Sequence, residues 1–124
     1  MYLIVLALML FIPSQATPEG PPRVIMMRPA MSPVPAGPVT ISVTFDRPMR
    51  AKSYSFVRIE GADYPDCGDA APVQSANLRT FTLRCRVEPG KRYKIGFNVG
   101  RFRNFVSAAD GQPALAATLS FTTR

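Results

Sequence analysis

Apolar and polar residues alternate over several short stretches of this chain. Between Val39 and Asp46 every second residue is apolar, and the same pattern returns over Arg79–Val87, over Tyr93–Val99 and over Ala117–Phe121. A period of two is typical of β-strands that bury one face against a core. These stretches therefore predict half-buried strands.

Three further stretches predict strands with a less regular pattern. Arg23–Arg28 is followed by Pro29, which limits this strand to the edge of a sheet. Ser53–Ile59 loses strict alternation, which a β-bulge would explain, and Pro72–Ser75 is a weak candidate. No stretch of the sequence shows a sustained helical period. Six or seven short strands in roughly a hundred residues predict an all-β sandwich in a single domain.

The turn at Pro89-Gly90 gives the most specific structural signal. Tyr93 follows it at the start of an alternating stretch. In β-sandwiches a tyrosine in this place forms a tyrosine corner, in which its hydroxyl bonds the backbone a few residues upstream. We expect Tyr93 to form such a corner where one strand leads to the next.

Three blocks of sequence resemble the SbsA-type bacterial Ig-like domain family. Ile41–Met49 (I-S-V-T-F-D-R-P-M) resembles the opening motif of the family, and Val87–Phe97 resembles its Pro-Gly crossing. Phe105–Gly111, followed by Leu119–Thr123, resembles its closing block. The resemblance runs from about Val24 to the end of the chain and implies an Ig-like β-sandwich of about seven antiparallel strands. It also implies an accessory module of exported or surface proteins, with no catalytic residues to carry over.

The N-terminal stretch has the character of an export signal. Tyr2–Ile12 is an unbroken apolar run that ends at Pro13, and small residues at Ser14 and Ala16 predict cleavage before Thr17. A spanning helix needs about twenty apolar residues, so a membrane anchor is the weaker alternative. We expect a signal peptide over 1–16, an extended leader over 17–22 and the sandwich over 23–124. The mature protein would then be secreted or periplasmic, with no transmembrane span.

The sequence contains two cysteines, Cys67 and Cys85. An exported chain meets an oxidising compartment, where an even number of cysteines favours a disulfide. The alternative is a pair of buried free thiols, since Cys85 lies among residues predicted to face the core. We expect the disulfide, although such a pair is not part of the general pattern of the Ig-like family.

The sequence gives little support to catalysis. Histidine is absent, which excludes Ser-His-Asp and Cys-His nucleophilic sites and imidazole metal clusters. Asp63, Asp66 and Asp69 could collect oxygen ligands for Ca²⁺, but their spacing does not match an EF-hand loop and ordinary turn residues are favoured. We expect no catalytic residue, metal or cofactor. The alternative is a small extracellular enzyme or enzyme inhibitor on the same scaffold, which a deep pocket with convergent polar groups would favour.

The charge of the chain is the strongest indication of a partner. Fifteen basic residues oppose eight acidic ones, giving a formal net charge of +7. A basic surface attracts anionic polymers, whereas the alternative is a solvated surface with no partner. We expect the strand that carries Arg84 to lie on a different sheet from Lys94, which would disperse the charge. The basic cluster consists of Arg84, Arg86, Lys91, Arg92, Lys94, Arg101 and Arg103.

The expected partner is a protein or an anionic cell-envelope polymer. Nucleic acid is disfavoured, because Tyr93 and Phe97 are predicted to face the core and are not free to stack on bases. Phe102 and Phe105 are better placed for exposed contacts, unless one of them tucks back onto the sandwich. The module is expected to be a monomer or to self-associate weakly, and the edge strand Arg23–Arg28 is the candidate for pairing.

Overall fold

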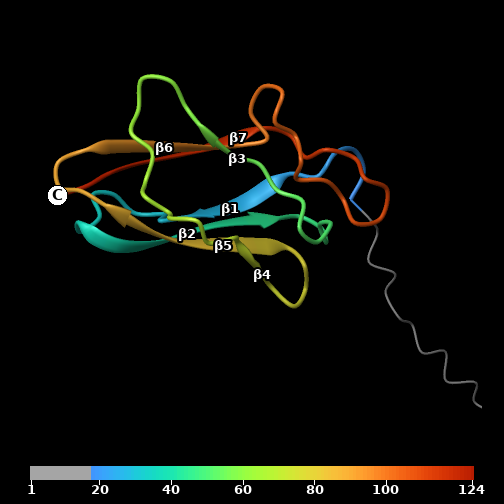
Figure 1. The fold of residues 1–124 in the computed structure, drawn as a ribbon. Helices are drawn as coiled ribbons and strands as arrows, with labels where there is room; N and C mark the ends of the chain where they lie inside the picture. The colour runs from blue at the N-terminus through green and yellow to red at the C-terminus, as the bar shows by residue number, and fades with distance from the viewer. Residues whose placement is uncertain (1–17) are drawn as a thin grey trace, which may run out of the picture.

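The computed structural model describes residues 18–124, which fold into two β-sheets packed face to face (Figure 1). The predicted signal peptide and its cleavage site lie outside the described residues. Within residues 18–124 there are seven strands, each antiparallel to its neighbours, and no helix, so the predicted all-β sandwich is confirmed. The strands are β1 (Val24–Arg28), β2 (Gly37–Phe45), β3 (Phe56–Arg58), β4 (Val73–Gln74), β5 (Thr80–Val87), β6 (Arg92–Phe97) and β7 (Ala117–Thr122).

The order of the strands is that of an immunoglobulin constant-type domain. One sheet has the order β1-β2-β5-β4 and the other β3-β6-β7. Lettered along the chain from A to G, these are the ABED and CFG sheets of that fold. The segment after β1 reaches the second sheet as well, because Val34 pairs in parallel with Thr123 beyond β7. The opposite side of the sandwich lies between the edge strands β3 and β4.

The alternating stretches bury one face each, as their sequence predicts. Ile41, Val43 and Phe45 of β2 are fully buried, and so are Ile95 and Phe97 of β6. These side chains meet between the two sheets and form one continuous core. The other strand residues of this core are Phe81, Leu83, Cys85, Val87, Tyr93, Leu119 and Phe121.

Phe105 lies at the centre of the aromatic packing, although it belongs to the long loop between β6 and β7. Its side chain is fully buried, and its ring centroid lies 5.0 Å from those of both Phe45 and Phe81. Phe56 packs against it at 5.4 Å. The other loop aromatic, Phe102, is 48% exposed. Of the two candidates for exposed contact, Phe105 therefore tucks back onto the sandwich and Phe102 remains at the surface.

Asn98 ends β6 and fixes the loop that follows. Strict alternation predicted a strand as far as Val99, but β6 ends at Phe97 because Asn98 has a φ of +56°. Asparagine tolerates this left-handed conformation better than most residues. Its buried amide donates to the carbonyl oxygens of Phe105 (2.8 Å) and Ala114 (3.0 Å), and its oxygen accepts the Phe105 N–H (2.9 Å). Asn98 thereby holds Phe105 in the core.

The expected tyrosine corner is present. The Tyr93 hydroxyl accepts the backbone N–H of Glu88 at 2.8 Å, across the turn that joins β5 to β6. The Tyr93 ring is stacked on Phe121 of β7 with a centroid distance of 5.5 Å. One side chain therefore ties a turn to the core.

Arg47 anchors the end of the expected leader to the sandwich. Its buried guanidinium donates to the carbonyl oxygens of Gly20 (2.7 Å) and Pro21 (3.2 Å) and pairs with Asp46 (3.0 Å). Burial raises the pKa of Asp46, but hydrogen bonds from Arg47 and from the Arg23 backbone outweigh this effect and hold the pKa below its usual value. The contacts bring the leader into the folded unit.

Replacing Phe105 with Ala should destabilise the domain by about 3–5 kcal/mol, because it leaves a cavity among several aromatic rings. The matched control is Phe102→Ala, which removes an exposed ring and should change the free energy of unfolding by less than about 0.5 kcal/mol. Urea unfolding followed by circular dichroism measures both. Equal effects of the two substitutions would show that Phe105 is not the central core residue.

Candidate functional site

The side of the sandwich between the edge strands β3 and β4, which we call the open side, is crossed by one segment. This segment consists of residues 63–72, and we call it the crossing segment. At its start, the Asp63 N–H donates to the Arg92 carbonyl (3.1 Å) and the Lys94 N–H donates to the Asp63 carbonyl (3.0 Å). Three residues later, Asp66 exchanges hydrogen bonds of 3.0 and 2.7 Å with Arg86. The segment thus pairs first with β6 of one sheet and then with β5 of the other.

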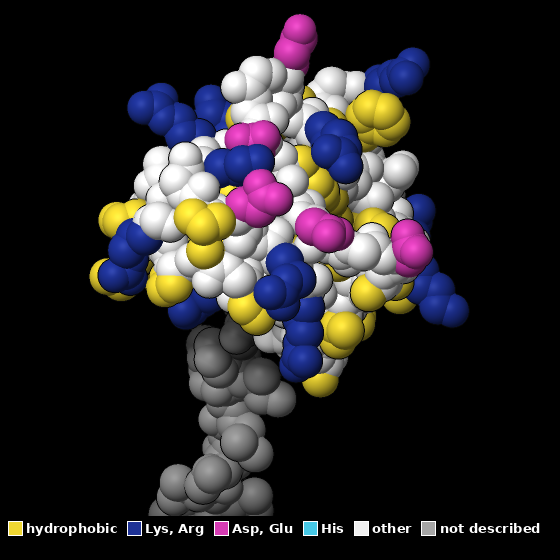
Figure 2. All heavy atoms as spheres, turned by 60° about the vertical axis from the view of Figure 1, so that its left-hand side comes forward, with side chains coloured by type: hydrophobic (Ala, Val, Ile, Leu, Met, Phe, Trp, Pro, Cys, Tyr) yellow, Lys and Arg dark blue, Asp and Glu magenta, His cyan; other side chains and the backbone are white. Residues whose placement is uncertain are grey.

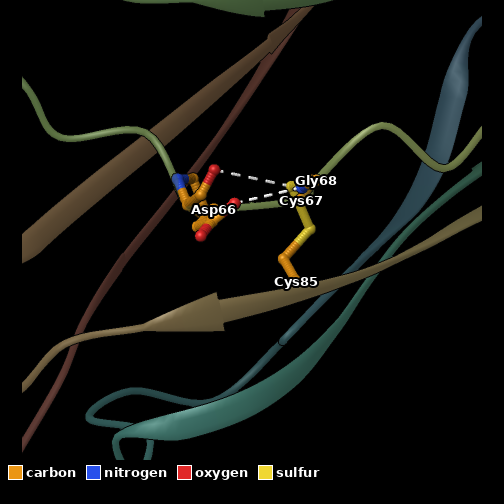
Figure 3. Close-up of a disulfide and its surroundings, with 5 residues drawn as sticks. Asp66, Cys67, Gly68 and Cys85 are labelled. Atoms are coloured by element: carbon orange, nitrogen blue, oxygen red, sulfur yellow. Dashed lines mark hydrogen bonds between the residues drawn. A yellow bond between two sulfur atoms is a disulfide. The ribbon is translucent and has the colours of Figure 1, made fainter.

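A disulfide fixes the crossing segment to the sandwich interior (Figure 3). Cys67 is bonded to Cys85, which lies on the inner face of β5 and is 4% exposed. The Asp66 carboxylate accepts the backbone N–H of Gly68 at 3.1 Å and shapes the turn on either side of Cys67. The bond joins residues 18 positions apart in sequence. The expected pairing of the two cysteines is the one that the structure contains.

A groove of about 730 Å³ opens between β3 and the crossing segment. Leu83 of β5, a buried residue of the core between the two sheets, lies at the base of the groove. The remaining walls are rich in aromatic side chains that are only partly buried or are exposed. These aromatic residues are Tyr54, Phe56, Tyr64 and Phe102.

Charged side chains line the rim of the groove. The Arg58 guanidinium lies 4.7 Å from the centroid of the Tyr64 ring, in a cation–π contact. Burial raises the pKa of Tyr64, although the charge of Arg58 opposes this effect, so its phenol is neutral at physiological pH. Asp66 and Asp69, which belong to the crossing segment, line the other wall of the groove. The groove therefore offers apolar faces together with one cation and two carboxylates.

The structure does not bring the three aspartates considered as Ca²⁺ ligands together into one group. Asp66 and Asp69 line the groove, whereas Asp63 lies where the crossing segment leaves β6. Among residues 18–124, no group of three or more His, Cys, Asp or Glu side chains is placed to hold a metal ion. The Asp66 carboxylate is used in the turn at Gly68.

The structure divides the basic cluster between the two sheets and a loop. Arg84 and Arg86 point outward from β5, whereas Arg92 and Lys94 point outward from β6 on the other sheet. Lys91 forms an ion pair with Glu88 at 2.6 Å. Figure 2 shows Lys and Arg side chains scattered over the face that it presents, with Asp and Glu among them. The predicted dispersal between sheets is confirmed, and the residues do not gather into one patch.

Arg101 and Arg103, the other members of the basic cluster, are exposed on the loop that follows β6. The Arg101 guanidinium lies 5.1 Å from the centroid of the Phe102 ring. Phe102 and Asn104 close one end of the groove. This loop is therefore where the basic cluster comes nearest to the groove.

The expected edge strand for self-association, β1, exposes two apolar side chains. Ile25 is 61% and Met26 48% exposed, and β1 pairs with β2 alone in its sheet. A bulge interrupts the pairing between Val24 and Met26. Bulges of this kind twist an edge and weaken its ability to pair with another strand.

Comparison with known proteins finds likenesses in fold. No family model matches the chain, and no curated protein sequence matches it. A structure of domains 1–6 of the surface layer protein SbsC aligns with a TM-score of 0.53 and 20% identity, over 84% of this chain and 14% of that one. A crystal structure of the S-layer protein rSbsC aligns with a TM-score of 0.51 and 21% identity, over 82% and 13%. The chain thus shares the fold of a region within much longer surface-layer proteins.

Residues 18–124 contain no helix that is long and apolar enough to span a membrane.

Replacing both Cys67 and Cys85 with Ser should destabilise the domain by about 3 kcal/mol, because the chain-entropy model assigns this cost to opening a loop of this size. Urea unfolding of the oxidised wild type and of the double variant measures the difference. The wild type treated with a reductant is the matched control and should behave like the variant. In the intact mass, reduction should add about two hydrogens, and no change would show that the thiols are free.

Proposed function

We propose that this chain is a noncatalytic Ig-like module of an exported bacterial protein, acting as a structural or binding domain in the periplasm or outside the cell. The observation that carries the proposal is the ABED/CFG sandwich, which aligns with a region of surface-layer proteins over more than four-fifths of the chain. A fold of this kind presents strands and loops to partners without requiring a catalytic centre.

The places of the three sequence blocks support membership of the SbsA-type Ig-like family. The opening block Ile41–Met49 supplies the second half of β2, the Arg47 anchor and the fully buried Met49. The crossing block Val87–Phe97 contains the tyrosine corner, and the closing block ends in β7. Each motif therefore has a physical role in the sandwich, which is what a family signature requires.

Two features support export. The apolar run Tyr2–Ile12, followed by small residues, has the pattern of a cleavable signal. The Cys67–Cys85 bond fits a compartment that is oxidising. Surface-layer neighbours agree with this location, since they are proteins of the cell surface.

The net charge of +7 supports an anionic envelope polymer as partner. Because the basic side chains point outward from both sheets, their attraction would act over the whole molecule and would not need one shaped site. Attraction of this kind is screened by salt and raises the local concentration of a polyanion.

Export should remove residues 1–16. Expressed in a bacterium with its own N-terminus, the protein should accumulate outside the cytoplasm with Thr17 as its first residue. Cell fractionation and intact mass of the purified chain measure the two outcomes. Replacing Ala16 with Arg should block cleavage and serves as the control, since a signal peptidase requires a small residue there. A wild-type chain that keeps residues 1–16 in the cytoplasm contradicts the proposal.

The mature domain should bind purified cell-wall sacculi that carry an anionic polymer, and sacculi stripped of that polymer should bind less. Raising the salt concentration from about 0.05 to 0.5 M should release it. The double variant Arg84→Gln/Arg86→Gln should bind more weakly, and so should Arg92→Gln/Lys94→Gln, because the charges are divided between the sheets. The matched control, Arg84→Lys/Arg86→Lys, keeps the charge and should bind like the wild type. Co-sedimentation measures all four, and binding that is indifferent to salt would contradict an electrostatic partner.

A further inference from the structure

The outer edge of β3 carries backbone groups that face the groove. β3 is an edge strand and pairs with β6 alone. The Asn98 N–H donates to the Ser55 carbonyl at 3.3 Å, so these two residues form a hydrogen-bonded pair of the ladder. Hydrogen-bonded pairs alternate along an antiparallel ladder, and the next one is therefore Val57 with Gly96. Because backbone groups alternate in direction along an antiparallel strand, the N–H and C=O groups of Phe56 and Arg58 point away from β6.

These outward groups have no backbone partner within residues 18–124. The crossing segment lies on the far side of the groove, and its backbone hydrogen bonds go to β6 through Asp63 and to β5 through Asp66. It does not pair with β3. A row of donors and acceptors at strand spacing therefore lines one wall of a groove of about 730 Å³.

The fold explains why this position is open. In the variable-type immunoglobulin domain an additional strand, C′, pairs with strand C of the CFG sheet. In this protein strand C is β3, and the chain instead leaves it to cross to the other sheet. The groove occupies the place where a C′ strand would lie.

We propose that the groove binds an extended peptide segment of a partner protein, which adds to β3 as a further strand. The backbone of the peptide would bond Phe56 and Arg58, as in other complexes formed by β-strand addition. Every second side chain would point toward the base at Leu83, so apolar residues are expected at those positions. A peptide strand satisfies donors and acceptors that alternate at this spacing.

Charge further defines the peptide. Arg58 lies on the Tyr64 ring, and its guanidinium forms no ion pair with any carboxylate in the described part of the chain. Arg58 lies two residues after Phe56 and therefore on the same face of β3, so a Glu or Asp at an inward position of the peptide, opposite Arg58, would pair with it. The expected ligand is therefore an extended segment with alternating apolar residues and a carboxylate. This site is distinct from the outward-facing basic residues of β5 and β6, so the inference does not depend on binding to an anionic polymer.

Amide hydrogen exchange, resolved by NMR, tests the premise and the binding together. In the free protein the amides of Phe56 and Arg58 should exchange faster than that of Val57, which is bonded to β6. The probe for binding is a displayed library of random linear peptides of about nine residues, which span roughly 30 Å when extended. Enriched peptides should alternate apolar and polar residues, carry a carboxylate, and slow the exchange of Phe56 and Arg58.

Two variants separate the backbone from the side chain of residue 58. Arg58→Pro removes the outward N–H and should weaken binding of an enriched peptide by at least about tenfold, because proline cannot donate to an added strand. The matched control, Arg58→Ala, keeps the N–H and should weaken binding less. Fluorescence anisotropy measures both, and circular dichroism checks that they fold.

Methylation of the peptide keeps the test independent of protein folding. N-methylation at alternate peptide residues, in the one register that faces β3, should abolish binding, while methylation in the other register should not. Equal loss in both registers, or full binding by Arg58→Pro, would overturn strand addition. Failure of the library to yield any peptide would overturn it as well. So would a glycan array that yields ligands for the groove when the peptide library yields none.

Discussion

The crossing segment passes from one sheet to the other and so shapes the whole side of the sandwich between β3 and β4. Asp63 completes the edge of β6, and Asp66 completes that of β5, so four residues join the two sheets on their open side. The Cys67–Cys85 bond holds this arrangement on the inner face of β5. The same detour leaves β3 with three residues and a free edge. Closure of the core at one point and opening of the groove beside it thus have one cause.

Loops rather than strands decide how the core of this domain is completed. Phe105 fills the space between the sheets from a loop, and Asn98 holds the backbone that delivers it. Buried backbone groups need partners, and the Asn98 amide supplies three hydrogen bonds where no strand continues. At the same end of the domain, Arg47 does the same for carbonyl oxygens of the leader. Two polar side chains that are themselves buried therefore take the place of regular structure.

The sequence predicted those parts of the fold that depend on local pattern. Alternation located β2, β5 and β7, and the Pro-Gly turn located the corner at Tyr93. Asn98 ends β6 through its left-handed backbone conformation, which the spacing of apolar residues does not predict. The choice between Phe102 and Phe105 was also open, since both lie close to Arg101 and Arg103 in one loop and no alternating pattern distinguishes them.

The site was harder to predict than the fold. The basic residues are close in sequence, but a turn between β5 and β6 places them on two sheets. The groove has the opposite character, because Tyr54, Leu83 and Phe102 come from distant parts of the chain. The aspartates around Cys67 were expected to be turn residues, but nothing in their spacing indicates that the segment leaves the outer edge of β3 unpaired. Edges and grooves arise from topology, which short motifs describe poorly.

The anchor at Arg47 also determines how the domain would respond to a pulling force. The described part of the chain begins at one end of the sandwich, and the C-terminus lies at the other (Figure 1). Tension between them would run along β1 and β7 and would load their hydrogen bonds in shear. The Val34 N–H bonds the Thr122 carbonyl at 2.9 Å, and the Arg124 N–H bonds the Val34 carbonyl at 3.0 Å, so these bonds would bear the load together. The Arg47 contacts with Gly20 and Pro21 lie nearest that end and would be loaded first, followed by the hydrogen bond from the Leu115 N–H to the Pro22 carbonyl (2.9 Å).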